Sequence, residues 1–223
     1  MTNKEIILDT ETTGLDIRDG HRIVEIGCLE IENFIPTKKT FHCYLNPERK
    51  VSEQAFKVHG YSDEFLSKQK KFSEVVDEFL KFIDGKKLVI HNAKFDISHI
   101  NNELMMVNRN KINFENVIDT LEIAKTKFPG AQISLDALCK RYHVDNKHRE
   151  WHGALLDSEL LAQVYLIMTG GQTTLFGEQS DNEKEVETAG VVDAVQKSYP
   201  DTPVILASEA ELQAHQEFLT MLE

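Results

Sequence analysis

Residues 6–14 read IILDTETTG, and this stretch decides the fold. The apolar residues 6–8 are typical of a buried strand. Asp9 and Glu11 follow with a period of two, so both side chains face the same side where the strand ends. Residues 12–14 are typical of a turn. The sequence therefore predicts a central strand that ends in a pair of carboxylates.

Two further blocks combine a histidine with an aspartate: HNAKFD at residues 91–96 and HGALLD at residues 152–157. A lone acid near a helix start is commonly structural, because it favours the helix dipole. If Asp96 and Asp157 join the first pair, however, four carboxylates repel one another and need cations between them. Their oxygens suit Mg²⁺ or Mn²⁺. His152 beside them could take a proton from water, and such a set suits two-metal phosphodiester hydrolysis.

The rest of the chain alternates apolar strands with amphipathic helices. We expect strands at residues 6–8, 22–31, 40–45, 87–90 and 117–118. We expect helices that start at Ser73 and Thr120, a helix capped by Ser134, and helices at residues 95–107 and 153–168. Three strands followed by alternating helices and strands predict an α/β fold, with a mixed five-stranded sheet flanked by helices.

The three acidic blocks resemble the motifs of the DEDDh 3′→5′ exonucleases, and within that family the proofreading exonucleases of bacteria. VHG at residues 58–60 and SLDALC at residues 134–139 support the resemblance, which covers residues 6 to about 171. It implies a ribonuclease-H-like exonuclease fold and two divalent cations, Mg²⁺ or Mn²⁺. The implied metal ligands are Asp9, Glu11, Asp96 and Asp157, with His152 as the general base.

The same resemblance implies contacts to the 3′-terminal nucleotides. The implied residues are Thr12, Thr13, Gln54, Val58, His59, Asn92 and Phe95. Gln54 departs from the family, which often has an acidic residue at this point, so the resemblance does not fix the contact to the 3′-hydroxyl. From the residues alone, His91 is expected to make structural hydrogen bonds at the end of a strand, and Asp119 to cap a helix.

The formal net charge of −12 is unevenly distributed. Residues 178–223 contain 11 acidic and 2 basic residues, so the preceding part is close to neutral. It lacks a basic stripe for tight, independent DNA binding, which favours an enzyme that receives its substrate from a partner. No run of about 18 apolar residues predicts a membrane span, and the N-terminus does not resemble a signal peptide. We expect a bacterial cytoplasmic protein at the replication fork and no membrane partner.

The C-terminal part is expected to be an extension of the exonuclease domain, which we place at residues 1–171. QTTLF at residues 172–176 resembles the peptide by which bacterial replication proteins bind the sliding clamp, through Gln172, Leu175 and Phe176. The alternative is that its two apolar side chains pack on the domain. Residues 177–203 are polar and acidic, which predicts a flexible linker. Residues 204–223 regain apolar side chains, and the resemblance implies that this tail binds the polymerase alpha subunit.

Three hypotheses follow. The first is a metal-dependent 3′→5′ exonuclease that removes mismatched nucleotides from single-stranded or frayed primer 3′ ends during replication. The second is a stand-alone DEDDh exonuclease in DNA repair or RNA trimming, against which the long acidic extension argues. The third is a scaffold without activity that joins polymerase to clamp, against which the intact set of acids and histidine argues.

Overall fold

The structure is a computed structural model, and it describes residues 4–147 and 151–170. The described residues all lie in one compact unit, residues 1–178, and a second unit, residues 179–223, lies outside them. The predicted clamp-binding peptide, linker and polymerase-binding tail lie outside them as well, and these domain boundaries therefore stay predictions.

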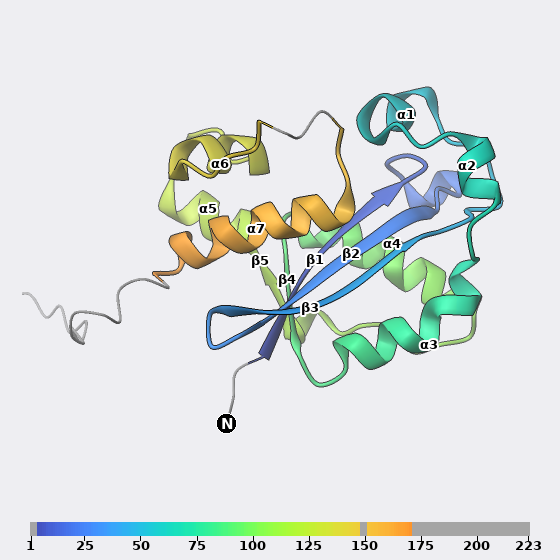
Figure 1. The fold of residues 1–223 in the computed structure, drawn as a ribbon, viewed down its shortest axis with the longest axis horizontal. Coiled ribbons are helices and arrows are strands. Elements are labelled where there is room, and N and C mark those ends of the chain that lie inside the picture. Colours follow the sequence, from blue (N-terminus) through green and yellow to red (C-terminus); the bar gives the residue numbers. More distant parts are fainter. Residues whose placement is uncertain (1–3, 148–150, 171–223) are drawn as a thin grey trace, which may run out of the picture. The chain divides into compact units, whose positions relative to one another are not determined.

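A five-stranded sheet forms the centre of the first unit (Figure 1). Its strands are β1 (Lys4–Thr12), β2 (Ile23–Glu32), β3 (Ile35–Tyr44), β4 (Lys87–Ile90) and β5 (Val117–Asp119). In space the order is β3-β2-β1-β4-β5. The pairs β3–β2 and β2–β1 are antiparallel, whereas β1–β4 and β4–β5 are parallel. The predicted mixed sheet with five strands is confirmed.

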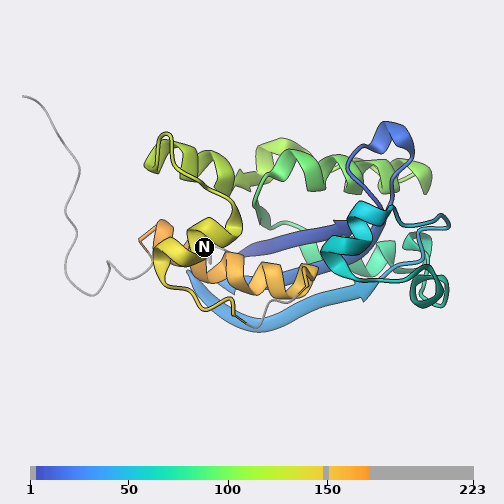
Figure 2. The ribbon, with the colours of Figure 1, turned by 90° about the horizontal axis from the view of Figure 1, so that it is seen from above.

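The two faces of the sheet carry different helices, and Figure 2 shows the strands between them. On one face, Ile6 and Leu8 of β1 pack in a core with residues of α3 (Phe72–Ile83) and α4 (Ala93–Met106). On the other face, Ile7 packs with residues of α7 (Ala154–Met168). Alternate residues of β1 therefore point toward opposite helix layers, as the pleat of a strand requires.

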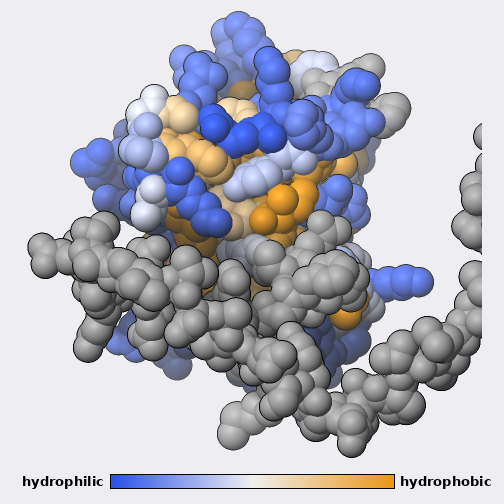
Figure 3. All heavy atoms as spheres, turned by 90° about the vertical axis from the view of Figure 1, so that its left-hand side faces the viewer, coloured by the Kyte–Doolittle hydropathy of each residue, from blue (hydrophilic) through white to orange (hydrophobic). Residues whose placement is uncertain are grey.

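The remaining helices are short. They are α1 (Glu53–His59), α2 (Asp63–Ser67), α5 (Thr120–Lys127) and α6 (Leu135–Tyr142), with 3-10 turns at Ile17–Asp19 and Phe114–Asn116. Ser134 caps α6 by accepting a hydrogen bond from the Ala137 N–H, as predicted. Figure 3 shows the side of the molecule on which α5 and α6 lie. Apolar side chains interrupt its largely hydrophilic surface. Within residues 4–147 and 151–170, no helix is long and apolar enough to span a membrane.

Several predicted boundaries were wrong. β3 begins at Ile35 rather than Thr40, because a tight turn at Asn33 and Phe34, both with positive φ, extends the hairpin. Helix α3 begins at Phe72 with Lys71 as its N-cap. Ser73, which was expected to start this helix, therefore lies inside it. The helices α1 and α2 were not predicted, since each is too short to show a helical period.

Candidate active site

Two carboxylates of the site come from the last residues of β1. Asp9 lies opposite Gly27 and Glu11 opposite Glu25 in the antiparallel pair with β2. Both therefore point to the α7 face, the same side that Ile7 occupies two residues earlier. Glu11 is 8% exposed and is held within the strand, which continues to Thr12.

A third carboxylate, Asp96, reaches this place from the first turn of α4. Its Oδ1 accepts hydrogen bonds from the Thr10 N–H (3.1 Å) and the Thr10 hydroxyl (2.7 Å). Asp119 fixes the start of α4, because its two carboxylate oxygens accept from the backbone N–H groups of Asn92 and Ala93. Burial raises the pKa of Asp96 to about 7, although the hydrogen bonds from Thr10 oppose that shift.

The last two members come from the start of α7. Asp157 is 3% exposed in the first turn of the helix. Nδ1 of His152 lies 3.4 Å from Oδ2 of Asp157. One ligand atom from each of Glu11, His152 and Asp157 lies within 4.8 Å of the others, so these three side chains could share one metal ion. The histidine is therefore placed either to ligate or to exchange a proton at the same point.

All five predicted residues of the catalytic centre line one cavity of about 180 Å³. Its lining residues are Asp9, Thr10, Glu11, His91, Phe95, Asp96, Leu135, His152 and Asp157. None of these is a lysine or an arginine, so these residues supply no fixed positive charge to the cavity wall. Burial and then the charge of Asp96 raise the pKa of Asp9 well above its usual range. A donor set of crowded carboxylates with this electrostatic cost fits divalent cations.

A larger cavity of about 690 Å³ adjoins the first and shares three of its lining residues, Thr10, Glu11 and Phe95. Five of the residues predicted to contact substrate line it: Thr12, Gln54, Val58, His59 and Phe95. The wall combines apolar and aromatic side chains, which stack on bases without sequence preference, with the carboxylates of Glu11, Asp16 and Asp19.

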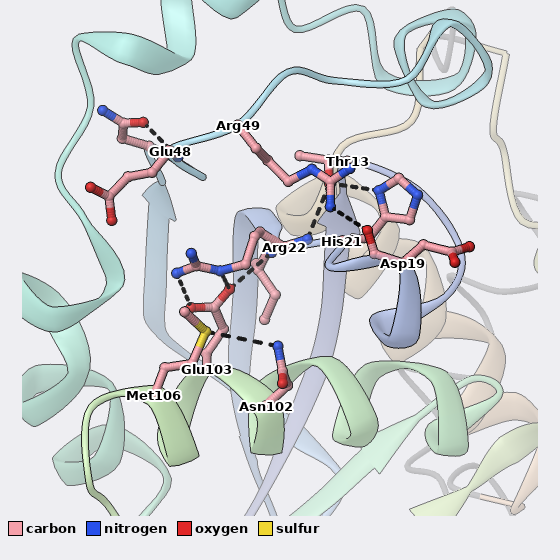
Figure 4. A network of polar contacts seen from close by, with 11 residues as sticks. Thr13, Asp19, His21, Arg22, Glu48, Arg49, Asn102, Glu103 and Met106 are labelled. Carbon is pink, nitrogen blue, oxygen red and sulfur yellow. Dashed lines mark hydrogen bonds and ion pairs between the residues drawn. The ribbon is translucent and has the colours of Figure 1, made fainter.

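The structure does not bring Thr13 or Asn92 into the lining of either cavity. Thr13 is fully buried, and its hydroxyl oxygen lies 3.0 Å from Nδ1 of His21 and accepts from the Arg22 N–H. Figure 4 shows this network, in which the Arg22 guanidinium also binds the Glu103 carboxylate of α4 at 2.6 and 2.7 Å. Thr13 therefore anchors the loop that walls the larger cavity. Asn92 is exposed and is the N-cap of α4, with a positive φ.

Comparison with known proteins decides the family. A model described as "Exonuclease" matches residues 6–165. The DNA polymerase III subunit epsilon of Rickettsia typhi is 48% identical over 219 residues, which cover 97% of this chain and 95% of that protein. The Escherichia coli subunit is 42% identical over 227 residues, which cover 99% and 93%. The chain belongs to the DNA polymerase III epsilon exonucleases. It is a 3′→5′ proofreading exonuclease, and the match along nearly its whole length disfavours a stand-alone nuclease.

Solved structures of other exonucleases share the fold. The nuclease domain of 3′hExo, described as a DEDDh family member, superposes with a TM-score of 0.66 at 18% identity and covers 76% of this chain and 93% of that one. An exonuclease I structure gives 0.67 at 12% identity, with coverage of 78% and 42%. At these identities the likeness supports the fold alone, and it bears out the expected ribonuclease-H-like architecture.

Two side expectations about this exonuclease are confirmed. Nδ1 of His91 lies 2.9 Å from the Thr120 hydroxyl, which is the structural hydrogen bond expected of a histidine at a strand end. Asp119 caps α5 by accepting from the Leu121 N–H. It also holds the start of α4, which the sequence did not indicate.

Sequence reasoning about the exonuclease missed Glu25, Gly27 and Tyr61. Glu25 is 2% exposed, and its carboxylate accepts hydrogen bonds from the Tyr61 hydroxyl (2.8 Å) and the Ala154 N–H (2.9 Å). A Cβ on Gly27 would lie 2.2 Å from the backbone of Ala154, so only glycine allows α7 this close to β2. The available signal was the acid and the glycine that interrupt the apolar run IVEIGCLEI, residues 23–31, on alternate positions.

Proposed function

We propose that Asp9, Glu11, Asp96 and Asp157 hold two divalent cations, Mg²⁺ or Mn²⁺, and that His152 is the general base of 3′→5′ hydrolysis. The observation that carries this proposal is the convergence of four acids from β1, α4 and α7 on one cavity whose lining residues include no lysine or arginine. When bound, the cations would stabilise the negative charge of the reacting phosphodiester.

Three residues of the chain have further roles in the proposed reaction: His152, Thr10 and Asp157. His152 keeps part of its ring accessible, with 43% of its side chain exposed, and so can take a proton from the attacking water and pass it to solvent. Thr10 orients Asp96 through two hydrogen bonds. Asp157 lies close enough to His152, with its Oδ2 3.4 Å from Nδ1, to orient the imidazole ring.

The proposed substrate is the frayed or single-stranded 3′ end of a DNA primer. The larger cavity would hold the terminal nucleotide against Val58, His59 and Phe95, with Gln54 and Thr12 as polar contacts. Thr13 would contribute through the loop that it anchors, and Asn92 through its place before the first turn of α4. Because stacking does not read base identity, the enzyme would select frayed ends rather than a sequence.

Hydrolysis of a primer with a mismatched 3′ end tests the assignment. Wild type should release single nucleotides in Mg²⁺ or Mn²⁺ and none in EDTA, and the mismatched end should be shortened faster than the paired end. Comparing the rate of hydrolysis of an RNA primer in the same assay shows whether the enzyme prefers DNA. Equal activity in EDTA would refute the metal proposal.

We further propose that the enzyme acts in the bacterial cytoplasm, tethered to two partners. Gln172, Leu175 and Phe176 would bind the sliding clamp, and residues 204–223 would bind the DNA polymerase III alpha subunit. Tethering would supply a high effective concentration at the primer end, in keeping with a catalytic part that has little net charge.

Two variants of the full chain separate these contacts. Alanine at Gln172, Leu175 and Phe176 should weaken clamp binding, since each apolar anchor typically contributes about 1 kcal/mol or more. Truncation after Glu178 should abolish co-elution with the alpha subunit. Both variants should hydrolyse free DNA at the wild-type rate. Unchanged clamp affinity, or full co-elution of the truncated chain, would contradict the respective contact.

A further inference from the structure

Glu25 joins three segments of the molecule that are far apart in the sequence. Its Oε2 accepts from the Tyr61 hydroxyl and from the Ala154 N–H, and its Oε1 lies 2.7 Å from Nε2 of His42. Burial and then the charge of Glu25 raise the pKa of Tyr61, so the phenol stays protonated and acts as the donor. The carboxylate is thus fully engaged and is not available to a cation.

The contact with Ala154 is made at the first residue of α7. The N-cap residue of this helix, Gly153, has no side chain to accept from the free N–H groups of the first turn. Glu25 supplies that acceptor from the neighbouring strand, with a negative charge that favours the helix dipole. The Ser158 hydroxyl donates to the Gly27 carbonyl at 2.9 Å and holds the next turn to the same strand.

A second set of contacts connects this helix start to the wall of the nucleotide cavity. The His152 N–H donates to the Val58 carbonyl at 3.1 Å. The Trp151 ring lies 3.1 Å from the place where a Cβ of Gly60 would be. Val58 is at the end of α1 and lines the larger cavity, so the general base is fastened by its backbone to a residue of the substrate-binding wall.

Tyr61 connects Glu25 to the wall of the larger cavity. Its N–H donates to Nδ1 of His59 at 3.0 Å, and the two rings stack with centroids 4.8 Å apart. His59 is 2% exposed and lines the larger cavity. A continuous path of contacts therefore runs from the cavity wall through His59, Tyr61 and Glu25 to the first residue of α7.

We infer that Glu25 and Tyr61 are positioning residues, which hold His152 and Asp157 in register with the β1 carboxylates and fasten them to the nucleotide-binding wall. Hydrolysis requires the base and the ligands to be placed to within a fraction of an ångström. The inference rests on the roles proposed above for His152 and Asp157, and it adds residues that contact neither substrate nor cation.

The chain offers a matched control for a purely structural acid. Glu30 belongs to the same strand, is 1% exposed, and binds Lys39, Lys86 and Thr37 away from α7. Glu25→Ala and Glu30→Ala therefore both remove a buried, bonded carboxylate from β2. Only the first should act on catalysis.

The test is steady-state hydrolysis of single-stranded DNA by the full chain in Mg²⁺. Glu25→Ala should lower kcat by about 10- to 100-fold, the usual effect of removing a group that orients active-site residues, with KM changed less than about threefold. Glu25→Gln keeps one acceptor for the Ala154 N–H and should recover part of the loss. Glu30→Ala should keep kcat within about twofold of wild type, even where melting shows destabilisation.

Tyr61→Phe covers the case in which Glu25→Ala fails to fold, since it removes only the hydroxyl and keeps the stacked ring. It should lower kcat by about 3- to 10-fold, in line with one lost hydrogen bond to a charged group. Trp151 is the single tryptophan of the chain, so acrylamide quenching of its fluorescence reports the segment next to His152. Quenching should increase in Tyr61→Phe and stay unchanged in Glu30→Ala.

The outcomes separate this inference from the proposed function. If His152→Ala is inactive while Tyr61→Phe and Glu25→Gln show wild-type kcat and quenching, the positioning role is wrong and the proposed function stands. If His152→Ala itself retains the wild-type rate, the proposed general base is wrong. A fall in kcat of equal size in Glu25→Ala and Glu30→Ala would reduce Glu25 to a structural acid and overturn the inference.

Discussion

Strand β2 and its neighbours place buried carboxylates in two regions with opposite electrostatics. Near the hairpin end, Glu30 binds Lys86 at 2.8 Å and Lys39 at 3.2 Å, and the hydrogen bond from Lys86 lowers the pKa of Glu30 to about 2. At the other end of the sheet, burial raises the pKa of Asp96 to about 7 and that of Asp9 well above its usual range.

Both acids are shielded from solvent, since Glu30 is 1% exposed and Asp96 is 3% exposed, but Asp96 lies deeper in the protein and Glu30 lies near the surface. A second difference is the source of compensating charge. The chain supplies two lysines to Glu30, whereas the cavity around Asp96 contains no lysine or arginine among its lining residues. An acid whose charge is balanced by lysines of the chain is already paired, whereas an acid that the fold buries beside other acids, with its pKa raised, is available to bind a cation.

The largest effect should come from removing a proposed ligand. Asp157→Ala, and equally Asp9→Ala, should abolish hydrolysis because the cations lose a carboxylate, while relief of repulsion leaves the metal-free protein as stable as wild type or more so. Assays on a mismatched primer in Mg²⁺, with thermal melting in EDTA, measure both results. Activity within about tenfold of wild type would show that the acid is not a ligand.

Replacing the proposed base should have the next largest effect. His152→Ala should lower the rate by about 10²- to 10⁴-fold, the usual contribution of a general base. The pH–rate profile of the variant should differ from that of wild type, because the group that accepts the proton has been removed. A variant with a near-normal rate and the wild-type profile would mean that another group accepts the proton.

Glu30→Gln should show the reverse pattern, with an effect on stability and none on rate. The variant leaves Lys86 beside a neutral amide, so the free energy of unfolding should fall by about 1–3 kcal/mol. Urea unfolding at pH 7 measures the loss, and primer hydrolysis by the same sample checks the rate. A fall in kcat without a change in stability would remove the distinction between the two regions.

The smallest effect is a difference in pH dependence. In the folded, metal-free protein the Asp96 carboxyl keeps its proton up to about pH 7, whereas in the unfolded chain it loses the proton near the usual pKa of 3.8. The contribution of Asp96 to stability therefore decreases as pH rises through this window. Asp96→Asn should remove this decrease, which amounts to about 1 kcal/mol or more between pH 5 and 8.

Urea unfolding in EDTA at the two pH values measures this difference. Adding Mg²⁺ at pH 8 should stabilise wild type and have little effect on Asp96→Asn. Glu30→Gln serves as the control, because the pKa of Glu30 is lowered and its contribution is lost only below the usual value of 4.5. Identical pH slopes for wild type and Asp96→Asn would contradict the raised pKa.

The sequence by itself determined the elements that have a regular period and the acids that follow them. The apolar run before Asp9 and the period of two between Asp9 and Glu11 predicted both the central strand and the shared side of the two carboxylates. The helix predicted at residues 153–168 follows His152 and contains Asp157, and the structure places Nδ1 of His152 3.4 Å from Oδ2 of Asp157. These predictions succeeded because strand and helix geometry act over a few residues.

Only the tertiary structure decided which distant residues hold the site together. Glu25 reads as an isolated acid in an apolar strand, and its contacts with Tyr61 and Ala154 span 36 and 129 positions of the chain. From the sequence alone, Gly27 is expected to weaken the same strand, and only the structure shows that α7 approaches it closely. Pairing across the sheet and packing of a helix on its face bring such residues together, and no local period in the sequence encodes that proximity.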